Sequence, residues 1–265
     1  MNIAMTSLCP RLALAAALAL ANGCGPILFP APKGNREPAV QGAQLLRLGT
    51  ATAETIALWA PPQPGRSVVV FFHGNATQIG DLGWLADALQ NEGNGILFVE
   101  YPGYGVANGS PSEASIYRSA ARALDELPKL GVGKTHTVLV GQSLGSAVAV
   151  EMAAQGYGSR LLLISPFSSI TDLVDGFVPF GLGGLFVTDK FDTLSKARRI
   201  TLETVIAHGD ADWLVPFDMA SEVASRIPGA TLEVFEGGGH NDLFARDNGR
   251  LLALIRTLAA AHSTN

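Results

Sequence analysis

Residues 136–149 read HTVLVGQSLGSAVA, a strand pattern joined to a helix pattern by a short glycine-bounded turn. Thr137–Val140 is a run of β-branched and aliphatic residues typical of a buried strand, and the Ala/Val-rich pattern of 144–155 predicts a helix. Between them, residues 141–145 read GQSLG, an instance of the pattern G-x-S-x-G. Its two glycines permit a strained turn that holds the Ser143 hydroxyl away from the backbone at a helix N-terminus. Ser143 is therefore the candidate nucleophile, and a serine that only caps the helix is the alternative.

Strand and helix patterns alternate on both sides of this stretch. The predicted strands are Leu45–Leu48, Thr55–Trp59, Ser67–Phe72, Gly95–Glu100, Leu161–Ile164, Thr204–Ala207 and Thr231–Phe235. The predicted helices are Ala76–Gln90, Ser112–Leu127, 144–155 and 248–261. This alternation predicts an α/β fold, with a mostly parallel central sheet flanked by helices.

A serine hydroxyl is a weak nucleophile until a base takes its proton. His240 lies in the glycine-rich loop Gly237–Asp242, between the last predicted strand and the last helix. That loop lets the imidazole reach over the carboxyl edge of the sheet, where Ser143 emerges. His73 and His208 stand at strand ends before glycines and are interpreted as structural, so His240 is the predicted base.

The third member of the set must orient His240 and stabilise its cation. The loop His208–Pro216 follows a predicted strand and carries two aspartates, Asp210 and Asp212. Asp210, in the turn itself, is well placed to accept backbone N–H bonds, whereas Asp212 can point toward the sheet edge. We favour Asp212, with Asp210 as the second choice. The chain order Ser143, Asp212, His240 is that of the α/β-hydrolase fold.

Attack on a carbonyl carbon creates an oxyanion, which needs hydrogen-bond donors already in place. The backbone N–H of Leu144, directly after the nucleophile, is one candidate. The loop Phe72–Asn75 follows an early buried strand, and its small Gly74 allows a close approach. The N–H of Asn75 is the second candidate, and a tight turn that Asn75 only caps is the alternative.

Residues 165–196 break the alternation of strands and helices. They hold glycines at 181, 183 and 184 together with five phenylalanines, Phe167, Phe177, Phe180, Phe186 and Phe191. An irregular apolar insertion between two core strands predicts a short cap over a pocket. Plain packing of a long connection is the alternative.

At these residues the chain resembles serine hydrolases of the α/β-hydrolase superfamily, in particular the Bem46-like branch, whose relatives include protein depalmitoylases. The segments that carry the resemblance are Ile27–Pro30, Phe71–Ile79, Val99–Gly105, Ser110–Glu113, Gly141–Ser146, Phe191–Lys196 and His208–Pro216. The resemblance implies catalysis by Ser143, Asp212 and His240, an oxyanion hole at Asn75 and Leu144, and no cofactor or metal. The eukaryotic relatives' thioester substrate does not carry over directly.

The first residues resemble a bacterial lipoprotein signal. Arg11 precedes the uncharged run Leu12–Ala21, which is too short to span a bilayer, and Cys24 follows small residues. We expect a signal at 1–23, lipidation of Cys24, a proline-rich tether at 24–42 and a single hydrolase domain at 43–265. The protein would then be held on a membrane of the bacterial cell envelope. An ordinary cleaved signal or a misassigned start is the alternative.

Composition narrows the function further. The 265 residues carry 18 Lys and Arg against 23 Asp and Glu, a net charge of −5 with no basic run, so nucleic acid is an unsuitable partner. The two cysteines, Cys9 and Cys24, exclude a disulfide scaffold. We expect hydrolysis of a small-molecule carboxylic ester or thioester through an acyl-enzyme. The alternatives are a non-catalytic binding or scaffold lipoprotein and an amidase or peptidase of the same superfamily.

Overall fold

The computed structural model describes residues 29–32, 38–50, 53–176 and 187–260. The strands are β1 (Gln44–Thr50), β2 (Ala53–Ala60), β3 (Val68–Phe72), β4 (Gly95–Glu100), β5 (Thr137–Gln142), β6 (Arg160–Ile164), β7 (Glu203–Gly209) and β8 (Thr231–Phe235). The α-helices are α3 (Gly83–Gln90), α4 (Glu113–Leu124), α5 (Leu144–Ala154), α6 (Ile170–Asp175), α7 (Leu194–Ala197), α8 (Phe217–Arg226) and α9 (Arg250–Ala260). The predicted signal, Cys24 and most of the tether lie outside the described residues.

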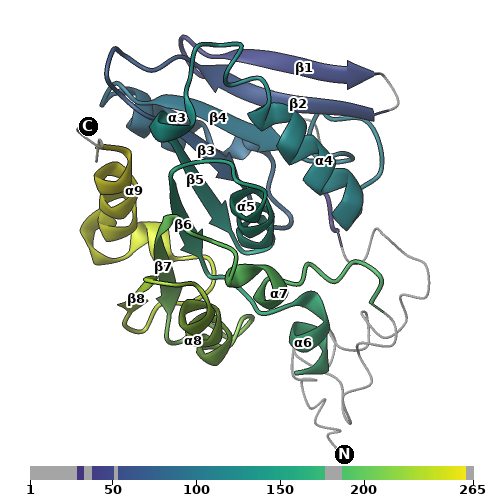
Figure 1. Cartoon of the computed structure of the whole chain (residues 1–265), viewed down its shortest axis with the longest axis vertical. Helices are drawn as coiled ribbons and strands as arrows, with labels where there is room; N and C mark the ends of the chain where they lie inside the picture. Colours follow the sequence, from purple (N-terminus) through teal and green to yellow (C-terminus); the bar gives the residue numbers. More distant parts are fainter. Residues whose placement is uncertain (1–28, 33–37, 51–52, 177–186, 261–265) are drawn as a thin grey trace, which may run out of the picture.

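The eight strands form one sheet in the order β1-β2-β4-β3-β5-β6-β7-β8 (Figure 1). β1 pairs antiparallel with β2, and β2 pairs antiparallel with β4, whereas every neighbouring pair from β4 to β8 is parallel. The predicted fold class is therefore confirmed. The chain builds outward from β3 to β4 and then crosses to β5 on the other side of β3. Ligands of open α/β sheets bind in the crevice at the carboxyl ends of strands that flank such a switch point.

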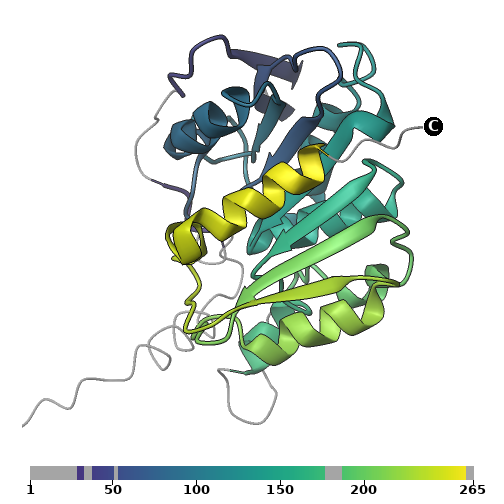
Figure 2. The ribbon, with the colours of Figure 1, turned by 90° about the vertical axis from the view of Figure 1, so that its left-hand side faces the viewer.

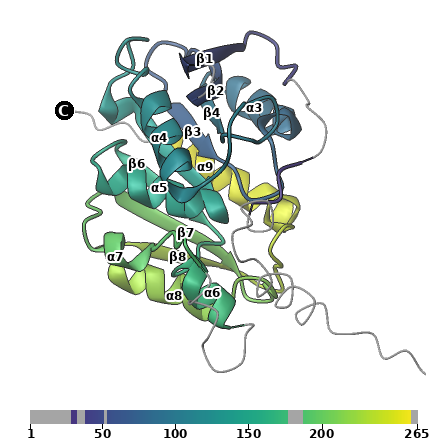
Figure 3. The same ribbon diagram turned by 90° about the vertical axis from the view of Figure 1, so that its right-hand side faces the viewer.

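Helices cover both faces of the sheet (Figures 2 and 3). Successive side chains of a strand point to opposite faces, so β3 contributes to two cores. Val68, Val70 and Phe72 belong to the core beneath α4, α5 and α8. Val69 and Phe71 belong to the core beneath α3 and α9. Among the described residues, no helix is long and apolar enough to cross a membrane.

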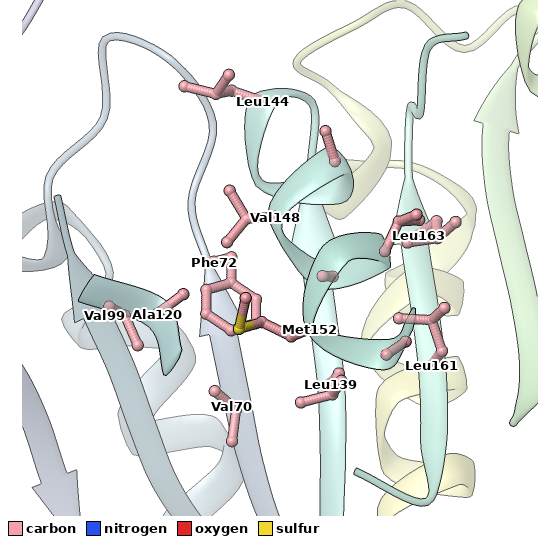
Figure 4. Packing of buried hydrophobic residues seen from close by; sticks show 14 of the residues in the cluster. Val70, Phe72, Val99, Ala120, Leu139, Leu144, Val148, Met152, Leu161 and Leu163 are labelled. Carbon is pink, nitrogen blue, oxygen red and sulfur yellow. The ribbon is translucent and has the colours of Figure 1, made fainter. Parts of the chain in front are cut away.

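α5, which begins at Leu144, packs against β3 at its first turn. Val148 and Met152 of α5 face Phe72 in the core that Figure 4 shows. A Cβ atom added at Gly145 would lie 1.9 Å from the carbonyl oxygen of Phe72. A Cβ atom added at Gly141 would lie 2.2 Å from the carbonyl oxygen of Gly145. Both glycines are therefore required by the close contact of α5 with the sheet.

The helical prediction differs from the structure in several places, which include the short helices α6 and α7 that begin within residues 165–196. The helix expected from residue 76 begins only at Gly83, because residues 73–78 form a loop in which Ala76 has a φ of 58°, outside the helical range. α8 (Phe217–Arg226) was not predicted. It buries only Ala220 and Val223, and half of its ten residues are polar or charged, so its apolar face is short.

We predict that Gly145→Ala destabilises the fold strongly, because the new methyl group has no space against β3. Overpacking usually costs about 1–3 kcal/mol of unfolding free energy, and this backbone clash should reach at least the upper end. Gly133→Ala is the matched control, since a Cβ there meets only Thr135 Oγ1 at 4.0 Å. Thermal and urea unfolding of both variants measure the effect, and equal stabilities would contradict this account of the turn.

Candidate active site

Ser143 stands in the sharp turn between β5 and α5. Its φ is 51° and its ψ is −116°, a conformation that costs a non-glycine residue about 1–3 kcal/mol and persists only where neighbours hold it. The Ser143 N–H donates to the carbonyl of Ile164 at 2.8 Å, and its own carbonyl accepts from Ser146 Oγ at 2.6 Å. These bonds fix the backbone of Ser143 and leave its hydroxyl at the carboxyl edge of the sheet.

The structure brings Ser143, His240 and Asp212 into one hydrogen-bonded chain. Ser143 Oγ lies 2.9 Å from His240 Nε2, and His240 Nδ1 lies 2.7 Å from Asp212 Oδ2. The Asp212 carboxylate can only accept a hydrogen bond, so His240 Nδ1 carries a proton and donates it to this bond. His240 Nε2 is then unprotonated and can accept the proton of Ser143. The loops that carry the three side chains follow β5, β7 and β8, which end at the same edge of the sheet.

The environment of Asp212 keeps its carboxylate ionised. Burial by itself would raise the pKa of Asp212, but the hydrogen bond from His240, the His240 charge and two backbone N–H groups together lower it. Those N–H groups belong to Leu214 and Val215, each 2.9 Å from Oδ1. One oxygen of Asp212 is thus held by the backbone while the other faces His240.

Asp210, the second choice for this position, lies elsewhere in the same loop. Its Oδ1 accepts from the Gly237 N–H at 2.6 Å, and the Ala211 N–H donates to the carbonyl of Gly238 at 3.0 Å. These contacts join the loop after β7 to the loop after β8. Asp210 therefore helps to hold the His240 loop in place through the backbone, whereas Asp212 binds the imidazole itself.

His208 lies fully buried beside this chain of groups. Its Nε2–H donates to the Val215 carbonyl at 3.0 Å, and the same nitrogen is 3.6 Å from Asp212 Oδ2. Burial lowers the pKa of His208, which therefore stays neutral at neutral pH. A neutral His208 supports the Asp212 loop and does not compete with His240 as a counter-ion.

The two predicted oxyanion positions, Asn75 and Leu144, line the same pocket as Ser143. Leu144 is the first residue of α5, and the loop after β3 brings Gly74 so close that a Cβ on it would lie 3.4 Å from Ser143 Cβ. Gly74, Asn75, Ser143, Leu144 and His240 all line one pocket. The loops of the switch point, after β3 and β5, therefore meet at the serine.

That pocket has a volume of about 390 Å³ and is mostly apolar. Its apolar walls come from the chain before β1, from the 165–176 segment and from the loop after β7: Phe29, Pro30, Phe167, Ile170, Leu173, Val174, Trp213, Leu214 and Val215. Its described lining includes no Lys, Arg, Asp or Glu side chain. The pocket therefore suits an uncharged, apolar group next to the serine.

The insertion at 165–196 contributes to this pocket in part. Phe167 lines it, but Phe191 packs instead against the rings of Phe29 and Tyr117. The other three phenylalanines fall in 177–186, outside the described residues. Across the part of the chain that the structure describes, no three His, Cys, Asp or Glu side chains gather as a metal site would need.

Comparison with known proteins gives a family match for the middle of the chain. Residues 69–199 match a model described as "Alpha/beta hydrolase family". Alpha/beta hydrolase domain-containing protein 17C of Xenopus tropicalis is 32% identical over 186 residues, which are 68% of this chain and 58% of that protein. The human protein of the same name is 30% identical over 183 residues, 67% of this chain and 54% of that protein. The chain thus spans little more than half the length of these curated relatives.

Solved structures share the fold. An esterase from Exiguobacterium antarcticum aligns with a TM-score of 0.60 at 19% identity, over 85% of this chain and 99% of that chain. An esterase from Pyrococcus furiosus aligns with a TM-score of 0.67 at 15% identity, over 84% of this chain and 97% of that chain. At such identities the likeness shows the fold alone. Taken with the sequence matches, it shows that the chain belongs to the alpha/beta hydrolase superfamily.

Proposed function

We propose that the protein is a serine hydrolase that cleaves a carboxylic ester or thioester through an acyl-enzyme. The observation that carries this proposal is the hydrogen-bonded chain from Ser143 through His240 to Asp212 at the mouth of an apolar pocket. A buried and ordered chain of this kind supplies a nucleophile, a base and a group that orients the base. A scaffold protein has no need of such an arrangement.

The first half of the proposed reaction acylates the enzyme. His240 Nε2 takes the proton of Ser143 as Oγ forms a bond to the carbonyl carbon, and the carbonyl oxygen becomes an oxyanion. The N–H groups of Asn75 and Leu144 donate to that oxyanion. His240 then returns its proton to the leaving oxygen or sulfur as the bond to the acyl carbon breaks.

The second half of the reaction releases the acid. Water gives a proton to His240 and attacks the acyl carbon, and the tetrahedral intermediate collapses as Ser143 Oγ leaves with the proton from His240. Asp212 stays ionised throughout and stabilises the imidazolium formed in each half. The reaction as written needs only these residues and water.

The pocket sets the proposed substrate class. Because apolar side chains line it, we assign it to the acyl chain of an uncharged ester or thioester. We also propose that the chain falls in the Bem46-like branch and that a lipid on Cys24 holds it on a bacterial envelope membrane. Both proposals rest on the sequence, and Cys24 lies outside the described residues.

A fluorophosphonate probe, which reacts with activated serines, tests the enzyme proposal. We predict stoichiometric labelling of the folded protein and its loss in Ser143→Ala, together with a fall in ester hydrolysis of about 10⁴-fold or more. Ser225→Ala, which removes an exposed hydroxyl on α8, is the matched control and should react like the wild type. Absence of labelling in the wild type would favour the binding-protein alternative.

The assignment of Asp212 rather than Asp210 predicts a clear difference between two amide variants. In Asp212→Asn the new amide N–H group faces His240 Nδ1 and favours the tautomer with Nε2 protonated, which cannot accept the serine proton. We expect kcat to fall by about 10³–10⁴-fold with the fold intact. In Asp210→Asn the side-chain oxygen still accepts from Gly237, so kcat should stay near that of the wild type. Steady-state kinetics and thermal unfolding compare the two, and a larger loss in Asp210→Asn would reverse the assignment.

A narrower pocket should change the acyl-chain preference. We predict that Leu173→Trp, on α6, lowers kcat/KM for a decanoyl ester by about tenfold or more and leaves an acetyl ester nearly unchanged. Leu130→Trp, at an exposed position outside the pocket, is the matched control. Rates with graded esters and thioesters measure the effect. Equal losses for the short and long esters would show that this wall does not contact the acyl chain.

A further inference from the structure

Two buried ionisable side chains, His73 and Glu100, make hydrogen bonds to the loop at residues 73–79, which carries the proposed oxyanion donor Asn75, and take no part in the proposed chemistry. His73 directly follows β3, and Glu100 is the last residue of β4. Their side chains are 0% and 1% exposed, and His73 Nε2 lies 2.8 Å from Glu100 Oε1. A pair of this kind is costly to bury unless its remaining polar atoms are also hydrogen-bonded.

The contacts around the pair satisfy all four of its polar atoms. His73 Nδ1 lies 2.9 Å from the carbonyl oxygen of Gly74, which can only accept, so Nδ1 carries a proton. Glu100 Oε2 accepts from the Ile79 N–H at 3.0 Å. One further proton lies between His73 Nε2 and Glu100 Oε1, so the pair is neutral overall whichever atom holds it.

These bonds hold the loop at both of its ends. Glu100 reaches the start of the loop through the His73 ring and the end of the loop at Ile79. Two tyrosines add to this: Tyr101 Oη donates to the His73 carbonyl at 2.9 Å, and Tyr104 Oη donates to Asn75 Oδ1 at 2.5 Å. Burial raises the pKa of both phenols, so both remain protonated donors.

The Gly74 carbonyl belongs to the same peptide group as the Asn75 N–H. A trans peptide is planar, so its C=O and N–H bonds point in opposite directions. The His73 ring therefore fixes the direction of the Asn75 N–H when it binds the Gly74 oxygen. Glycine at 74 would otherwise permit this peptide to rotate, because a residue without Cβ has few steric limits. A hydrogen bond at the carbonyl also polarises the N–H of the same group.

We propose that His73 and Glu100 are positioning residues that hold the Gly74–Asn75 peptide with its N–H directed at the oxyanion. The proposal rests on the function proposed above and deepens it. Because an oxyanion exists in the transition state and not in the bound ester, loss of the pair should lower kcat and leave KM nearly unchanged.

Two substitutions of Glu100 distinguish a positioning role from a role in charge or proton transfer. Glu100→Gln keeps both contacts, since its amide N–H can donate to His73 Nε2 and its oxygen can accept from Ile79. Glu100→Met has a similar length and volume but makes neither contact. Loss of a single oxyanion donor lowers kcat by about 10²–10³-fold in known cases. We expect such a loss in Glu100→Met, and kcat within about threefold of the wild type in Glu100→Gln.

The readouts distinguish positioning from misfolding. Each kcat is divided by the fraction of molecules that a fluorophosphonate labels at the end point, which counts folded sites. A trifluoromethyl ketone, which forms an oxyanion when Ser143 adds to it, should bind Glu100→Met more weakly by the same factor as kcat falls. KM for the ester should change by less than about threefold.

Three outcomes would overturn the proposal. Wild-type kcat per labelled site in Glu100→Met would show that the pair is not needed, and a matched loss in Glu100→Gln would assign it a role in charge or proton transfer. If Glu100→Met cannot be labelled, His73→Leu is the second variant, because it removes the imidazole that binds the Gly74 carbonyl. Failure of both to fold while Glu100→Gln folds would make the pair structural only. Loss of the proposed function itself is recognised separately, by the absence of labelling in the wild type.

Discussion

The geometry of the site depends on how closely α5 approaches β3. Only glycine at 145 lets the first turn of the helix lie against the Phe72 carbonyl, and this contact leaves Ser143 at a φ of 51°. The strain of that turn, about 1–3 kcal/mol, is offset by a helix whose residues from Leu144 to Val150 are all buried. Because the strain is held by packing on the sheet, the serine hydroxyl has a fixed direction before any substrate binds.

Two groups of contacts meet at this serine from opposite halves of the sheet. The loops after β7 and β8 bring Asp212 and His240 from one side, and hydrogen bonds between those loops fix their relative position. The loop after β3 brings Asn75 from the other side, and β4 supports it through Glu100. In the proposed mechanism the loops after β7 and β8 serve proton transfer, and the loop after β3 serves stabilisation of the oxyanion charge. The sheet provides the common rigid frame for both.

Much of this arrangement could be predicted from sequence, because the signals are local. The β-branched run before Gly141 and the apolar helix after Ser143 identify the turn, and a loop rich in glycine identifies His240. Asp210 and Asp212 could be ranked only by their place in the turn, since both follow the same strand and lie two residues apart. The contacts that separate them, to Gly237 and to His240, come from elements far along the chain.

Other features depend on tertiary contacts that no local pattern reveals. The stretch from Ala76 has helical composition, yet bonds to β4 and the following turn hold it as a loop, so the helix begins at Gly83. α8 was missed because only two of its residues are buried. His73 was interpreted from the sequence as structural and not as the base. Its pairing with Glu100 joins residues 27 positions apart and has no sequence signature.

The proposed mechanism depends on the strained turn, which holds Ser143 Oγ as the atom that becomes acylated. The most direct test is to mix the folded protein with an activated apolar ester, quench in acid within the first turnover, and map the modified peptide by mass spectrometry. The account predicts one acyl group per molecule, on Ser143, that disappears as the acid product is released. An acyl group on another residue, or turnover with no acylated serine at any time point, would contradict it.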